Sequence, residues 1–282
     1  MKKRIAIILL LALIIFSVRP VETLASTNTH SGSFVLASSQ SVYDNTDFGI
    51  TGNVTIEAWI KPTTVTTGGT NIGLFQLGKA STGISYDLRF QDGLAAGGLR
   101  AVRAKHGVGN SNVDYIAGDF SGTWLHVVIW YDGTDFKLYT APQGGSHTER
   151  GTIAASGSGN ANNTFDGILI AGNDTDDNST LTPAQFYGGL VDEVRVWNTA
   201  RTTTQLDNNF ETELVGNETG LVAYYKMNND WNDTTANAYN LTASNSPTFS
   251  TTVPFTGAAD VIILPERIRL KGHIQLNGHV KL

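Results

Sequence analysis

The side chains best suited to chemistry share one face of three candidate strands. In residues 54–61, Glu57 and Trp59 alternate with aliphatic residues, and successive side chains of a strand point to opposite faces. Segments 124–131 and 189–197 repeat the pattern. If the three segments pair in one sheet, one face of it carries Glu57, Trp59, Trp130, Glu193, Arg195 and Trp197.

Two interpretations of such a face are open. In the first, the tryptophan rings stack on sugar rings and the charged groups bind hydroxyls, so the six residues are candidate ligand contacts. In the second, loops cover the tryptophans, which form a second layer of core, because aromatic side chains bury large areas. Glu193 and Arg195 then form an ion pair within the sheet.

Carboxylates suited to glycoside hydrolysis are not evident. That reaction needs two carboxyl groups roughly 5–10 Å apart. Asp192 and Glu193 are adjacent, so on a regular strand they point to opposite faces, and Arg195 occupies the next place beside Glu193. Glu57 and Glu193 are still able to approach each other from different strands. The chain has no cysteine and no serine in a Gly-x-Ser-x-Gly turn, so we predict a non-catalytic protein.

A loop at residues 173–178 is dense in oxygen ligands, which calcium requires. Asp174 and Asp176 have the spacing of an EF-hand loop, but Ser179 and Gln185 replace its glycine and its bidentate glutamate. The loop is therefore either a calcium site of another kind or a solvated polar turn.

Period-two segments separated by Gly, Asn, Asp, Ser and Thr begin at residue 33 and predict an all-β antiparallel fold. Asp132-Gly133 predicts a hairpin turn. One short helix is expected over residues 202–213, where Thr202 can cap the amino end. The candidate strands are 54–61, 84–91, 99–104, 124–131, 136–140, 167–171, 189–197 and 221–227.

The amino terminus has the form of a secretory signal peptide. Three basic residues precede an apolar run over residues 5–18, which is short for a membrane span, and Ala25 ends a small-residue cleavage site. The alternative is an uncleaved anchor. Without residues 1–25 the chain keeps 15 basic and 24 acidic residues, a net charge of −9. This balance disfavours nucleic acid and anionic membranes as partners.

The carboxyl-terminal residues differ in composition from the rest. A six-residue pattern occurs at 268–273 and again at 274–279, and each copy ends in Gly-His. We predict a signal peptide at 1–25, a linker at 26–32, one domain at 33–255 and a β-rich tail at 256–282 that serves assembly or attachment. Two histidines without a third ligand do not predict a metal site.

Four segments, in this order, resemble the laminin G-like jelly rolls of the concanavalin A-like lectin/glucanase superfamily as found in bacterial surface proteins. The likeness covers residues 33–255 and leaves out the tail. The segments are Val-Thr-Ile-Glu-Ala-Trp-Ile-Lys-Pro at 54–62, Trp-Leu-His-Val-Val-Ile-Trp-Tyr-Asp-Gly at 124–133, Gly-Leu-Val-Asp-Glu-Val-Arg-Val-Trp-Asn at 189–198, and Gly-Leu-Val-Ala-Tyr-Tyr-Lys-Met at 220–227 with its loop at 233–237.

The resemblance implies a two-sheet antiparallel jelly-roll sandwich with a short helix after residue 198. It also implies a structural calcium ion at the rim, where Asp233 and Asn237 match the family's acidic loop. Related glucanases place acidic residues two apart on one strand, whereas Arg195 stands at the second of these places here.

We therefore expect a secreted or cell-surface binding module, with carbohydrate or a glycoprotein as its ligand in recognition or adhesion, and with calcium as a structural ion. The alternative is a structural protein without a small ligand, whose tail at 256–282 binds a partner or another copy by strand addition. A glycoside hydrolase or lyase is the third alternative.

Overall fold

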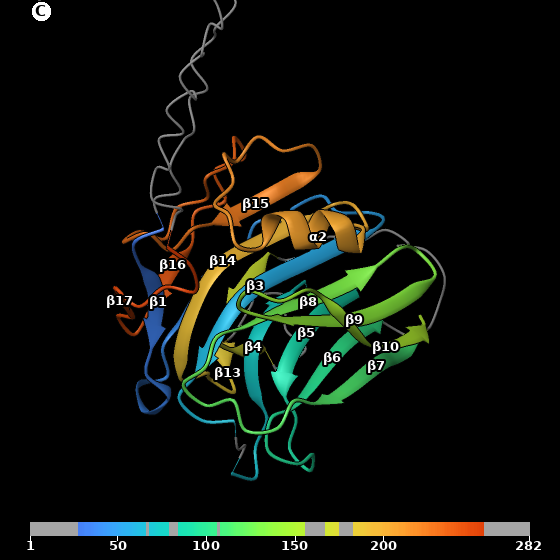
Figure 1. Ribbon diagram of the computed structural model, residues 1–282, viewed down its shortest axis with the longest axis horizontal. Helices are drawn as coiled ribbons and strands as arrows, with labels where there is room; N and C mark the ends of the chain where they lie inside the picture. The colour runs from blue at the N-terminus through green and yellow to red at the C-terminus, as the bar shows by residue number, and fades with distance from the viewer. Residues whose placement is uncertain are drawn as a thin grey trace, which may run out of the picture. The chain divides into compact units, whose positions relative to one another are not determined.

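Two antiparallel sheets account for most of the residues that the computed structural model describes, which are 28–65, 68–78, 84–105, 108–155, 167–174 and 183–256 (Figure 1). This arrangement confirms the predicted sandwich. The predicted signal peptide, nearly all of the predicted tail, and Asp176 lie outside the described residues.

The first sheet, called sheet A, has β3 (Val54–Pro62) and β14 (Gly189–Trp197) at its centre. Its strand order is β10-β9-β8-β3-β14-β1-β17, and β15 also pairs with β14. The remaining bounds are β1 (Ser31–Phe34), β8 (Leu125–Tyr131), β9 (Asp135–Pro142), β10 (Thr148–Ala154), β15 (Leu221–Tyr225) and β17 (Thr248–Ser250).

The second sheet, called sheet B, has the order β16-β2-β11-β4-β5-β6-β7. β12 and β13 form a separate two-stranded sheet, whose β12 contacts β4 of sheet B. The bounds are β2 (Ser41–Asp44), β4 (Ile72–Leu77), β5 (Ile84–Phe90), β6 (Gly98–Lys105), β7 (Gly109–Ile116), β11 (Ile168–Ile170), β12 (Asn173–Asp174), β13 (Pro183–Ala184) and β16 (Thr242–Ser244).

The core between the sheets follows from the alternation seen in the sequence. Val54, Ile56, Ala58 and Ile60 of β3 all lie in the main buried cluster, whereas Trp59 packs in a separate cluster on the outer face of sheet A. Burial of this aliphatic face is the main favourable term for folding, at about 25 cal/mol per Å² of apolar surface.

All eight candidate strands are present, with ends that differ by a few residues. The strands that the sequence did not predict are short, buried throughout or mostly polar. Every residue of β4 is buried, including the polar Gln76, so apolar and polar residues do not alternate along it. β7 and β10 are mostly polar, because β10 forms one edge of sheet A and β7 one edge of sheet B.

Helix α2 (Thr203–Asn209) confirms the predicted helix but ends four residues earlier than expected. Thr202 caps its amino end in a reciprocal arrangement with Gln205, in which each side chain binds the backbone N–H of the other residue. After Phe210 the chain is no longer helical. The carbonyl groups of Phe210 and Thr212 accept hydrogen bonds from side chains of sheet A. Figure 1 shows α2 lying across β14 and β3.

Candidate functional site

The three tryptophan-bearing segments form neighbouring strands of one sheet, so the condition for a shared face is met. In sheet A, β3 lies between β8 and β14. Glu57 is opposite Arg195, and Thr55 is opposite both Trp130 and Trp197. One face of the sheet therefore carries all six candidate ligand contacts.

The tryptophans on this face are covered. Trp59 and Trp197 are fully buried and Trp130 is partly buried. The indole N–H of Trp59 donates to the carbonyl of Phe210 at 2.7 Å, and that of Trp130 to the carbonyl of Arg201 at 2.8 Å. The rings thus attach α2 and its flanking residues to the sheet. This burial matches the second interpretation, a second layer of core, and leaves no open stacking surface at Trp59 or Trp197.

The predicted ion pair of Glu193 and Arg195 is present and fully buried, with 2.5 Å between Nη2 and Oε2. Arg195 also donates to the carbonyls of Asn209 at 3.0 Å and Thr212 at 2.6 Å, which satisfies carbonyl groups at the carboxyl end of α2. Glu57 accepts the indole N–H of Trp197 at 2.7 Å. In this structure these charges hold the polypeptide together and are not exposed to a ligand.

A β-bulge changes the geometry of the acidic pair. The pairing of β14 with β3 shifts between Asp192 and Arg195, and Glu193 has a left-handed backbone with φ of 53°. Val191 and Val194 both point into the main core, so Asp192 and Glu193 between them both point outward. The expectation that the two carboxylates face opposite ways is therefore wrong, because the extra residue of the bulge breaks the alternation.

Neither carboxylate of this pair is accessible. Burial raises the pKa of Glu193 to about 7, and burial together with the charge of Glu193 raises the pKa of Asp192 well above its ordinary value. The Tyr224 hydroxyl donates to Glu193 at 2.6 Å, and Asn28 donates to Asp192 at 3.0 Å. Both carboxylates thus bind groups of the protein, whereas the carboxylates of a hydrolase must contact the substrate.

Two histidines that the sequence did not single out as a pair connect the sheet to α2. His126 Nδ1 lies 2.8 Å from His147 Nε2, and His147 Nδ1 lies 2.7 Å from Asp207 Oδ1 on the helix. Burial, with electrostatic interactions with His147 and Arg195 adding to it, lowers the pKa of His126 well below its ordinary value. Since Asp207 is 60 residues from His147 along the chain, no local pattern predicts their contact.

The predicted calcium ligand Asp233 is engaged by the protein. One carboxylate oxygen accepts the N–H groups of Tyr224 and Thr235, both at 2.9 Å. The other accepts the Thr235 hydroxyl at 2.8 Å and the N–H of Tyr239 at 3.0 Å. A carboxylate has about four acceptor sites, so the residues of this loop do not fit a calcium ion. Asn237 donates its side-chain N–H to the carbonyl of Val222.

The other predicted calcium loop is described only in part. Asp174 lies in β12, and its backbone N–H donates to the Gln76 side chain at 2.9 Å. Asp176 lies outside the described residues. Within the ranges that are described, no three His, Cys, Asp or Glu side chains are grouped so that they could hold a metal ion.

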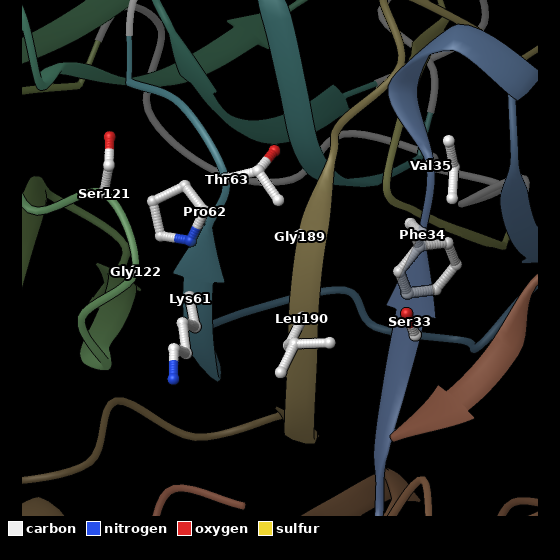
Figure 2. A pocket seen from close by; sticks show the side chains of 10 residues that line it. All are labelled: Ser33, Phe34, Val35, Lys61, Pro62, Thr63, Ser121, Gly122, Gly189 and Leu190. Carbon is white, nitrogen blue, oxygen red and sulfur yellow. The ribbon is translucent and has the colours of Figure 1, made fainter. Parts of the chain in front are cut away.

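An open groove lies on the same outer face of sheet A, beyond Leu190. Its volume is about 550 Å³. Figure 2 shows that the lining comes from β1, β3, β14 and the loop before β8. The side chains that define its chemistry are Ser33, Val35, Lys61, Thr63, Ser121 and Leu190. The sequence placed Lys61 on the face of Trp59 but did not indicate that this end of the strand is open.

Backbone hydrogen bonds hold the groove in shape. The N–H of Gly122 donates to the carbonyl of Pro62 at 2.7 Å, which attaches the loop to β3. The N–H and hydroxyl of Thr63 both donate to the carbonyl of Gly188 at 3.0 Å, which attaches β3 to the start of β14. Gly189 has a φ of 145°, and a Cβ there would lie 2.4 Å from the carbonyl oxygen of Lys61. The walls are thus set before any ligand binds.

Comparison with known proteins places these observations in a family. The family model described as the concanavalin A-like lectin/glucanases superfamily, of laminin G type, matches residues 35–207. No curated protein sequence is significantly similar to this chain. No helix in the described part of the chain has the length and apolar character that crossing a membrane requires.

Several solved structures are similar to this chain. A candidate carbohydrate-binding protein from Bacteroides ovatus is 21% identical with a TM-score of 0.56, and the match covers 80% of this chain and 60% of that protein. The sialidase CBM40 of Ruminococcus gnavus, bound to α2,3-sialyllactose, is 14% identical with a TM-score of 0.45, over 64% of this chain and 98% of its own. The LG1-3 region of the laminin α2 chain is 13% identical with a TM-score of 0.46, over 64% of this chain and 33% of its own.

Proposed function

Because this chain belongs to the concanavalin A-like lectin/glucanases superfamily, we propose that it is a non-catalytic module that binds carbohydrate in the groove on the outer face of sheet A. The observation that carries the proposal is the contrast in access on that face. The carboxylates that could act on a glycosidic bond are buried under α2, whereas the groove is open and has no carboxylate in its lining.

The lining has the composition of a sugar site. The half-buried Leu190 and the exposed Val35 offer apolar surface to the faces of sugar rings. The hydroxyls of Ser33 and Ser121 can bind sugar hydroxyls. A mostly apolar concave surface with a few placed polar groups is typical of small-ligand sites. The Bacteroides protein named above supports the same ligand class.

Export and a bound calcium ion are further parts of the proposal that rest on the sequence. Export rests on residues 1–25, and calcium rests on the loop that contains Asp174 and Asp176, since the Asp233 loop does not fit the ion. Assembly through residues 256–282 stays a prediction, because that segment lies almost wholly outside the described residues.

A glycan array with the purified protein, run in calcium and repeated in EDTA, tests the proposal. We expect binding to a defined glycan class and no release of shorter sugars on prolonged incubation. Val35→Asp adds a charge to the groove wall without disturbing the core, because Val35 is 51% exposed, and should weaken binding. Val215→Asp, at a residue that is 61% exposed and outside the groove lining, is the matched control and should bind normally. Silence of the array in both buffers, or release of sugar, contradicts the proposal.

A further inference from the structure

We propose that the groove recognises an acidic saccharide, and that the ammonium group of Lys61 binds the carboxylate of a uronic acid unit. This assignment rests on the proposed function and names the ligand class for the same site. It follows from the charge, the setting and the surroundings of Lys61.

Lys61 has no acidic partner. None of the described carboxylates forms an ion pair with Lys61, and the groove lining contains neither Asp nor Glu. Two other lysines do form ion pairs with carboxylates: Lys137 binds Glu149 at 3.1 Å, and Lys226 binds Glu213 at 3.5 Å. In a chain with a net charge of −6, an unpaired cation in a groove is complementary to an anion supplied by the ligand.

The setting of Lys61 strengthens an ion pair with a ligand. Its side chain is half-buried and lies across from Leu190 in the adjacent strand. A ligand seated on the apolar walls displaces water around the ammonium group, and a charge pair is stronger where water is excluded. The hydroxyls of Ser33 and Ser121 on either side supply additional hydrogen bonds.

The lining selects a carboxylate over other anionic groups. Proteins commonly hold phosphate and sulfate with the planar fork of arginine, which binds two oxygens at once. The groove contains no arginine and a single lysine. One ammonium group with neighbouring hydroxyls matches a single carboxylate, and the apolar walls match the rings that carry it.

Isothermal titration of the purified protein with a short oligogalacturonate and with its methyl ester tests this assignment, since esterification adds a methyl group to each carboxyl group and removes its negative charge. We expect the acid to bind at least about tenfold more tightly than the ester, as for a hydrogen-bonded ion pair. Lys61→Met should abolish the difference and Lys61→Arg should keep most of it. Lys137→Met, which removes a paired lysine outside the groove, should leave it unchanged.

The outcomes separate the two proposals. Equal binding of acid and ester, or a preference that survives Lys61→Met, overturns the assignment while carbohydrate binding stands. Binding of sulfated oligosaccharides alone overturns the choice of a carboxylate. A protein that binds neither these probes nor any neutral glycan on the array overturns the proposed function itself.

Discussion

Two regions of the outer face of sheet A use the same strands in opposite ways. At one end, Glu57 and Arg195 lie under α2, fully buried, with hydrogen bonds to the sheet or to the residues after the helix. At the other end, Lys61 and Leu190 of the same two strands line an open groove. A buried charge must find its partners within the protein. A charge in an open groove is solvated by water and stays free to bind a ligand, so only the second region is suited to ligand recognition.

The largest expected effect is a loss of stability when the buried ion pair under α2 is removed. Arg195→Met leaves Glu193 buried without its cation and should lower the free energy of unfolding by about 3–5 kcal/mol in urea titrations. Arg100→Met is the control, because the Arg100–Asp114 pair is partly exposed to solvent, so its loss should cost less than about 1 kcal/mol. Equal losses for the two variants would show that the pair under α2 is not specially buried.

The closing loop after β15 offers a second buried carboxylate for the comparison. Asp233→Ala leaves the N–H groups of Tyr224, Thr235 and Tyr239 without their acceptor, so we expect a loss of about 2–3 kcal/mol. Since protein donors occupy the carboxylate, any change in the melting temperature of the protein that EDTA causes, by removing calcium from the loop of Asp174 and Asp176, should be the same in the wild type and in Asp233→Ala. A fall in melting temperature with EDTA that is absent in Asp233→Ala would instead make Asp233 a metal ligand.

Trp59→Phe distinguishes packing from sugar stacking. The phenyl ring keeps most of the apolar contact but loses the hydrogen bond to the carbonyl of Phe210, so we expect a loss of about 1–2 kcal/mol. Glycan binding should be unchanged in the folded variant. If binding disappears while the circular dichroism spectrum is preserved, the ligand site lies under α2.

The covered region should also respond to acid. The pKa of His126 in the folded protein lies below the ordinary 6.5, so the unfolded chain takes up this proton first. Stability from this group is complete above pH 6.5 and is lost as the pH falls below it. Glu193, whose pKa is raised to about 7, acts in the opposite direction, with stability lost as the pH rises from 4.5 towards 7.

The two contributions separate in a difference measurement. Unfolding curves of the wild type and of His126→Gln, recorded from pH 5 to pH 8, should converge in slope above pH 6.5 and diverge below it. Parallel curves throughout would mean that His126 is not shielded from protons in the folded state.

The smallest effect is expected in the groove. Lys61→Met removes a charge that has no protein partner, so the free energy of unfolding should change by less than about 0.5 kcal/mol. The same denaturant titration measures it. A loss above 1 kcal/mol would reveal an internal role for Lys61 and remove the contrast between the two regions.

Local patterns were sufficient for the eight predicted strands and for the start of the helix, but not for strands such as β4, β7 and β10. The alternation in β3 assigned Ile56 and Ala58 to the core face and Trp59 to the other, as observed. The side chains of Thr202 and Gln205 determine where α2 begins. They do so because the atoms involved are within a few residues of one another, so that the sequence carries the whole interaction.

The faces of β14 were predictable only up to the bulge. Asp192 and Glu193 point to the same face of the sheet because the register between β3 and β14 shifts there. That register depends on two strands that are far apart in the sequence. The end of α2 has the same origin, since Trp59 and Arg195 donate hydrogen bonds to the carbonyls of Phe210 and Thr212, which follow it.

The sequence by itself thus determined a β sandwich with an aromatic and charged outer face on sheet A. Only the tertiary structure decided which end of that face is covered and which is open. The physical reason is that burial depends on the return of residues 199–214 over β3, β8 and β14, through contacts such as His147 with Asp207. Lys61 remains accessible because residues 199–214 do not extend over the groove.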